Sequence, residues 1–309
     1  RLALGEIGFE SAPDGKIRFR TVATIDGPFS GGRVAGLSLP LAGRFGAGDF
    51  ALGEGCVTAG FRGLQVQNLR LGPARLPLCP TGRALVWQDG RGRMQGGADL
   101  RGPRVAGRLG HAPIAVAARR LRVDLAGFAA EAVAVRLGAS SGGNRLDVAH
   151  LNARCVPRGV SGAFGGLAGD LANVPLLASA GSGQWRFLGG RLQLDGRVML
   201  ADRQQPARFN PLAGENFRLT LIDNRIHATG ALAHPESATR VALATIDHDL
   251  RTGAGAALLD IADLRFTPQF QPDALTRLTI GVVALVDGSL SGQERIAWDS
   301  GGDRSTGTF

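Results

Sequence analysis

Short runs of alternating apolar and polar residues, separated by glycines or by Asp and Asn, repeat along the whole chain. Almost no stretch shows a helical period. An alternation of period two is typical of strands that bury one face. The sequence therefore predicts an all-β fold, a long, twisted antiparallel sheet with few short helices, apolar on one face and polar on the other.

One hairpin shows this pattern most clearly. A two-residue turn at Gly189-Gly190 sets Trp185 opposite Leu194 and Phe187 opposite Leu192. Side chains alternate across a strand, so these four residues share one face. Arginine and glutamine occupy the positions between them.

A second hairpin repeats the arrangement, with Asp223-Asn224 as the turn and Leu221 opposite Ile226. Together the two hairpins predict one apolar face that lines a groove: Trp185, Phe187, Leu192, Leu194, Val198, Leu200, Phe217, Leu219, Leu221 and Ile226. The residues alone leave two arrangements open, because the same side chains suit an open groove or a closed sandwich.

A third hairpin is expected at Asp89-Gly90, with Trp87 opposite Gly92 and Leu85 opposite Met94. An aromatic ring over a strand glycine protects the backbone there. The best helix candidate spans residues 272–278, where a proline occupies the first turn.

The composition of charged and aromatic residues argues against nucleic-acid binding. The net charge of +9 comes almost entirely from arginine, since Lys16 is the only lysine, and tyrosine is absent. Nucleic-acid-binding proteins cluster their charge and interleave it with aromatic residues. Here the arginines alternate with apolar residues, which indicates a solvated outer face that discourages edge pairing. We expect no nucleic-acid partner.

The cysteines are too few for a metal site or a dense disulfide framework. Cys56 and Cys79 are separated by enough chain for two strands and a turn, so they are candidates for a cross-strand pair. Cys155 fits a small buried apolar residue better.

The residues around each candidate catalytic motif do not fit the structure that the motif needs. We therefore expect neither an enzyme nor a cofactor or metal. Residues 138–142 match G-x-S-x-G, but a turn and another strand follow instead of the helix that this motif needs. Asp247, His248 and Asp249 are adjacent on a strand and must alternate between its faces, which argues against one shared metal ion. Residues 90–96 miss the dinucleotide fingerprint and lie on a hairpin.

The chain begins at Arg1 and stops at Phe309 within a strand-and-turn pattern. We therefore expect residues 1–309 to be one continuous segment of a longer protein that lacks its N-terminal anchor and its C-terminal end. The longest apolar stretches, 112–118 and 280–286, are far shorter than the ~20 residues that a membrane helix needs.

Ordered groups of residues from about position 55 to the end resemble the YdbH family of Gram-negative envelope proteins. The resemblance rests on the stretches 76–80, 107–110, 173–177, 208–212, 266–276, 278–288, 291–292, 296–299 and 305–307.

This resemblance implies an AsmA-like protein of the periplasm with an N-terminal inner-membrane anchor. It implies a bent sheet whose apolar groove carries phospholipids between the membranes, with a small outer-membrane lipoprotein as partner. In that oxidising compartment we expect Cys56 and Cys79 to be linked and Cys155 to be free.

Two other function classes remain. A structural or adhesive β-solenoid would have a closed core and no lipid cargo. A polysaccharide-binding protein would need exposed aromatic residues beside paired carboxylates, and the sequence shows no such pairs.

Overall fold

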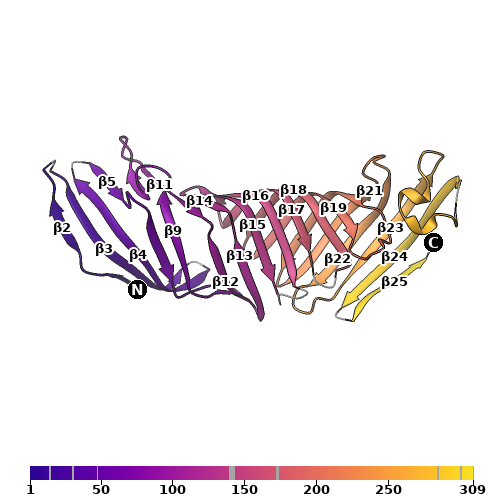
Figure 1. Cartoon of the computed structure of the whole chain (residues 1–309), viewed down its shortest axis with the longest axis horizontal. Helices are drawn as coiled ribbons and strands as arrows, with labels where there is room; N and C mark the ends of the chain where they lie inside the picture. The colour runs from indigo at the N-terminus through magenta and orange to yellow at the C-terminus, as the bar shows by residue number, and fades with distance from the viewer. Residues whose placement is uncertain are drawn as a thin grey trace. The chain divides into compact units, whose positions relative to one another are not determined.

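The computed structural model describes residues 1–13, 15–29, 31–46, 48–138, 143–171, 174–283, 285–299 and 301–308. Strands make up 71% of the chain and helical residues 2%, and the strand pairs among the described residues are antiparallel, which confirms the predicted all-β class (Figure 1). The chain divides into two compact units, unit 1 from Arg1 to Gly143 and unit 2 from Asn144 to Phe309.

Unit 1 is a meander of long strands that are interrupted along their length. The short strands β5, β6 and β7 pair with successive parts of the long strand β4. On their other side, β5 pairs with β10, β6 with β9 and β7 with β8. The strands of unit 1 are β1 (Leu2–Leu4), β2 (Gly8–Ser11), β3 (Ile17–Phe29), β4 (Gly32–Gly46), β5 (Asp49–Leu52), β6 (Val57–Phe61), β7 (Gly63–Val66), β8 (Leu69–Leu71), β9 (Ala74–Pro80), β10 (Val86–Gln88), β11 (Met94–Arg101), β12 (Arg104–Leu109), β13 (Ala112–Ala117), β14 (Arg120–Asp124) and β15 (Gly127–Leu137).

Unit 2 is a simpler meander in which each strand pairs with the next one in sequence. In Figure 1, β17 and β18 slope one way and β23 and β24 slope the other, as the twist of the sheet accumulates. The strands of unit 2 are β16 (Asn144–Val156), β17 (Gly159–Asp170), β18 (Leu176–Leu188), β19 (Arg191–Asp202), β20 (Leu212–Ile222), β21 (Arg225–Ala233), β22 (Arg240–Asp249), β23 (Gly255–Phe266), β24 (Gly288–Asp299) and β25 (Gly302–Thr308).

The two clearest predicted hairpins are confirmed. Trp185 lies opposite Leu194 and Phe187 opposite Leu192 in the β18–β19 pair. Leu221 lies opposite Ile226 across the second turn. Both turns use positive φ angles at their two central residues, as two-residue hairpin turns of type I′ require.

The predicted register of the third hairpin is wrong. Trp87 lies opposite Gln95, and Met94 lies opposite Gln88. The Asp89 side chain accepts hydrogen bonds from two backbone N–H groups further along the loop, so it stabilises a five-residue loop over residues 89–93 instead of a two-residue turn.

Trp87 still covers a glycine, but a different one from that predicted. Its ring occupies the space that a side chain at Gly82 would need. On the neighbouring strand it lies opposite Ala51, which has no exposed surface. The close approach of ring and backbone therefore requires glycine at position 82.

The predicted helix at 272–278 is two separate turns of 3₁₀-helix, η1 (Pro272–Ala274) and η2 (Arg277–Thr279). Thr276 between them has extended backbone angles, and its side chain accepts a hydrogen bond from the N–H of Leu278. This cap starts a second turn and interrupts the first. Within the described part of the chain, no helix has the length and apolar character needed to cross a bilayer.

The chain exposes much surface for its size. Its solvent-accessible area is 18354 Å² at a mass of 32.1 kDa. Two compact domains of half this mass would together expose only about 15,000 Å². The excess follows from sheets that leave large parts of both faces in contact with solvent.

Candidate functional site, an apolar face of the sheet

Strand register in unit 2 aligns the predicted apolar residues into two cross-strand rows. The first, the Trp185 row, joins residues of seven successive strands: Trp185, Leu194, Leu219, Ala228, Ile246, Ala257 and Ile296. The second, the Phe187 row, runs two residues further along the same strands: Phe187, Leu192, Leu221, Ile226, His248, Gly255 and Trp298.

All ten predicted groove residues lie on this face. Nine of them are half-buried, and Val198 is buried with 8% exposure. The indole N–H of Trp185 donates to the carbonyl oxygen of Asn152 on β16, 3.0 Å away, which fixes its ring at the edge of the row. The face therefore keeps large apolar side chains in partial contact with solvent.

The opposite face of the same strands is polar. Arg186 donates from Nε to the Gln193 side chain at 2.6 Å, and Arg218 donates from Nε to Asp195 at 2.8 Å. Both arginines are exposed, and each bonds to a residue of the neighbouring strand. Arg186, Arg218 and Asp195 thus lie on the face away from the two rows.

Sequence alternation missed part of the apolar face because two strands contain bulges. An extra residue in β18, near Ala180, and another in β20, near Asn216, shift the alternation by one. Both residues have left-handed backbone angles. As a result Ala178 and Leu212 lie opposite Leu200, on the apolar face, although their spacing from the hairpin predicts the other face.

The rows are covered where they reach β23 and β24. Val174, from the connection before β18, is buried in a cluster with Ala257 and Trp298, and Leu171 and Leu176 pack against it. The open part of the two rows is thus their half-buried side chains on β18–β20, and this connection closes the rows further along. A second buried cluster, which contains Leu212 and Leu232, covers the same face next to Leu200.

A buried polar pair lies within the closed part. The indole N–H of Trp298 donates to Nδ1 of His248 at 3.1 Å, and His248 is only 6% exposed. Burial lowers the pKa of this imidazole, against the opposing effect of the charge on Asp249. The Trp298 ring also fills the space above Gly255, where a Cβ would lie 2.7 Å from Cζ2.

His248 and its neighbours behave as strand alternation predicts. Asp247, on the opposite face, is exposed, and its carboxylate accepts a hydrogen bond from Nδ1 of the His227 ring at 2.8 Å. Asp249 pairs with Arg251. No group of three potential metal ligands occurs among the described residues.

A network of charged residues, here called the clasp, ties the β19–β20 connection to β25. Arg208 donates to Asp202 from Nε at 2.8 Å and to Asp303 from Nη1 at 2.6 Å. Burial alone would raise the pKa of Asp202, but the hydrogen bonds from Arg208 and from the N–H of Gln204 hold it below its usual value. The hydrogen bonds that Arg208 donates to Asp202 and Asp303 raise the pKa of its guanidinium, against the effect of burial.

Unit 1 has an apolar row of its own, which the sequence had shown only as separate strands. Register aligns Val34, Leu64, Leu71, Gly107, Ile114 and Leu137 across six strands. Except for buried Val34 and the glycine, these positions carry half-buried aliphatic side chains. Arg33, Arg70 and Arg108 form the adjacent row, whose side chains alternate to the other face.

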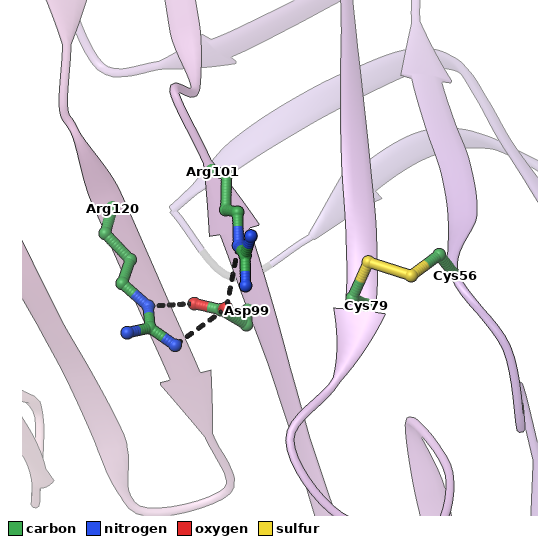
Figure 2. The surroundings of a disulfide bond; sticks show 5 residues. All are labelled: Cys56, Cys79, Asp99, Arg101 and Arg120. Carbon is green, nitrogen blue, oxygen red and sulfur yellow. Dashed lines mark hydrogen bonds and ion pairs between the residues drawn. A yellow bond between two sulfur atoms is a disulfide. The ribbon is translucent and has the colours of Figure 1, made fainter.

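A disulfide joins Cys56 and Cys79 in unit 1, with their Cα atoms 4.0 Å apart (Figure 2). Asp99 lies on the strand next to Cys79 and accepts from Nε of Arg120 at 2.6 Å. This hydrogen bond holds the pKa of Asp99 below its usual range, against the effect of desolvation.

The prediction for Cys155 is wrong in one respect. It is a free thiol, as expected for this residue, but it is exposed instead of buried. Cys155 lies opposite Val160, which lies opposite Phe187, so it extends the Phe187 row to β16. Of the G-x-S-x-G candidate at 138–142, residues 139–142 lie outside the described residues.

A comparison with models of known protein families shows to which family the chain belongs. The family model described as YdbH-like, intermembrane phospholipid transport protein YdbH, matches residues 12–309. The chain belongs to the YdbH-like family. The match begins well before position 55, so the N-terminal strands of unit 1 also carry the family pattern. No curated protein and no solved structure matches the chain.

The YdbH-like family is one of transporters with phospholipid as cargo and the cell envelope as location, and it is not a known class of enzyme. The prediction that this chain resembles YdbH proteins is thereby confirmed.

Proposed function

We propose that this chain is a segment of a bridge-like lipid transfer protein, in which the apolar face shelters phospholipid acyl chains as they move between the inner and outer membranes. The observation that supports this most is the open part of the two rows. Large side chains such as Trp185, Leu194 and Leu219 gather there on one face, yet none is completely buried.

The energetics suit sheltering. Removing a methylene from water gains about 0.8 kcal/mol, so a ~16-carbon tail gains on the order of 10 kcal/mol from full shelter. Transfer also needs similar affinity at successive positions, because one deep site would trap the lipid. The two rows themselves carry Leu, Ile, Phe and Trp and no charged residue on β18–β21, which meets that requirement.

The proposed location of this protein is the periplasm. A disulfide between Cys56 and Cys79 is stable in such an oxidising compartment. An N-terminal inner-membrane anchor and a small outer-membrane lipoprotein as partner follow from the family resemblance.

Site-specific photo-crosslinking tests the proposal. A crosslinking amino acid at position 194 or 219 should capture phospholipid in cells, because both positions lie in the Trp185 row. The matched controls are positions 186 and 218, on the polar face of the adjoining strands. Equal capture at all four positions, or none at 194 and 219, would contradict the proposal and favour a structural β-protein without lipid cargo.

A further inference from the structure

The segment that runs from η2 to β24 exposes five large apolar side chains to solvent. Leu278 is 65% exposed, Ile280 60%, Val282 79%, Val283 43% and Leu285 92%. We call these described residues, 278–283 and 285, the 278–285 loop. In Figure 1 it belongs to the gold segment beside β24.

Such exposure is exceptional within unit 2. The most exposed large apolar residue elsewhere in the described part of this unit is Leu243, at 47%. A cluster of exposed aliphatic side chains on a soluble surface usually marks an interaction site.

The base of the loop is firmly held. The side chain of Gln271 donates from Nε2 to the carbonyl oxygen of Val286 at 2.9 Å and accepts from the Val286 N–H at 2.8 Å. Thr276 caps the other end and donates from its hydroxyl to the carbonyl oxygen of Arg208. Beneath the loop, Val286 packs against a buried cluster that contains Phe270. The exposed side chains therefore extend from a fixed platform.

Several backbone N–H groups of the loop are already paired. The N–H of Ile280 donates to the carbonyl oxygen of Arg277 at 3.2 Å. Those of Val282 and Val283 both donate to the carbonyl oxygen of Thr279, at 3.0 and 2.9 Å. Unpaired backbone N–H groups cost free energy in an apolar medium. Because these N–H groups are paired within the loop, its side chains can enter an apolar medium at a lower free-energy cost.

We infer that the 278–285 loop contacts a lipid bilayer, with its aliphatic side chains at the boundary between headgroups and acyl chains. No charged residue occurs between Arg277 and Asp287, so entry into this boundary desolvates no charge. Stable protein interfaces use about 20–30 residues on each side, many more than this loop offers. This inference extends the proposed function, because it names a part of the chain that touches a membrane.

Flotation with vesicles of equal parts phosphatidylethanolamine and phosphatidylglycerol tests the inference. The double variant Val282→Asp/Leu285→Asp should bind at least about ten-fold more weakly than the parent chain. Aspartate suits position 285, whose φ of 57° is left-handed. The matched control is Leu243→Asp on β22, which should bind as the parent does.

The outcomes separate cleanly. A parent chain that does not float, or a double variant that floats equally well, would overturn the inference. So would a parent that self-associates in analytical ultracentrifugation through these residues, because a second copy would then be the occupant. Lipid that copurifies with the protein is measured in parallel and should be unchanged in the double variant. Vesicle binding without any copurified lipid would contradict the proposed sheltering and leave the membrane contact standing.

Discussion

Leu194→Asp distinguishes an open apolar face from a sealed one. Leu194 lies between Trp185 and Leu219 in its row and is half-buried. Full burial of a leucine gains about 1.5–3 kcal/mol, so losing a half-buried one should cost about 1–2 kcal/mol of unfolding free energy. In a sealed core the unpaired carboxylate would add several kcal/mol. We therefore expect a folded protein that has lost its lipid.

The control is Gln193→Asp, one residue away on the polar face. Gln193 accepts a hydrogen bond from Arg186, and an aspartate there can accept the same bond. Its unfolding free energy should stay within about 0.5 kcal/mol of the parent, with copurified lipid unchanged. Urea denaturation followed by circular dichroism gives the stability, and mass spectrometry gives the lipid. The reasoning is refuted if Leu194→Asp unfolds the protein, or if the folded variant retains its lipid.

Three further predictions concern stability. Cys56→Ser should lower the unfolding free energy of unit 1 by about 2–4 kcal/mol in urea titrations, because the disulfide closes a loop with a sequence separation of 23, and Cys155→Ser should leave it unchanged. Because burial depresses the pKa of His248, the unfolded chain binds a proton below about pH 6.5 that the folded chain does not. Stability should thus fall between pH 7 and pH 5.5, and an equally steep fall in His248→Gln would disprove this assignment. Arg208→Met should cost about 3–5 kcal/mol, since the Asp202 side chain has no exposed surface, whereas a cost below about 1 kcal/mol would show that the clasp contributes little.

The apolar rows could be predicted from the sequence where turns are short and strands are regular. Two-residue turns at 189–190 and 223–224 set the register directly, and alternation then places each side chain. At Asp89 the same logic failed, because a side chain that accepts two backbone hydrogen bonds stabilises a longer loop. No periodicity reveals which of these two turns forms.

The covered end of the site was beyond prediction for a different reason. Val174 and Trp298 are more than a hundred residues apart, and they meet only because the sheet twists through several strands. The bulge at Ala180 was equally hidden, since alanine gives no sign of a left-handed backbone. Local patterns fix which residues of a strand share a face, but accumulated twist decides what covers that face.

The sequential pairing of β16–β25 has a consequence for how such a protein changes length over evolutionary time. Each strand is bonded only to the strands before and after it, so duplication of one hairpin adds two strands and about 10 Å in the direction of the backbone hydrogen bonds. The new strands inherit the same apolar face, and no backbone pairing between distant strands has to be rebuilt. A one-residue insertion within a strand, by contrast, reverses the face of every residue beyond it unless a bulge absorbs the change. Under the proposed bridge-like function, whole hairpins are therefore the unit by which relatives of this chain would match envelopes of different width.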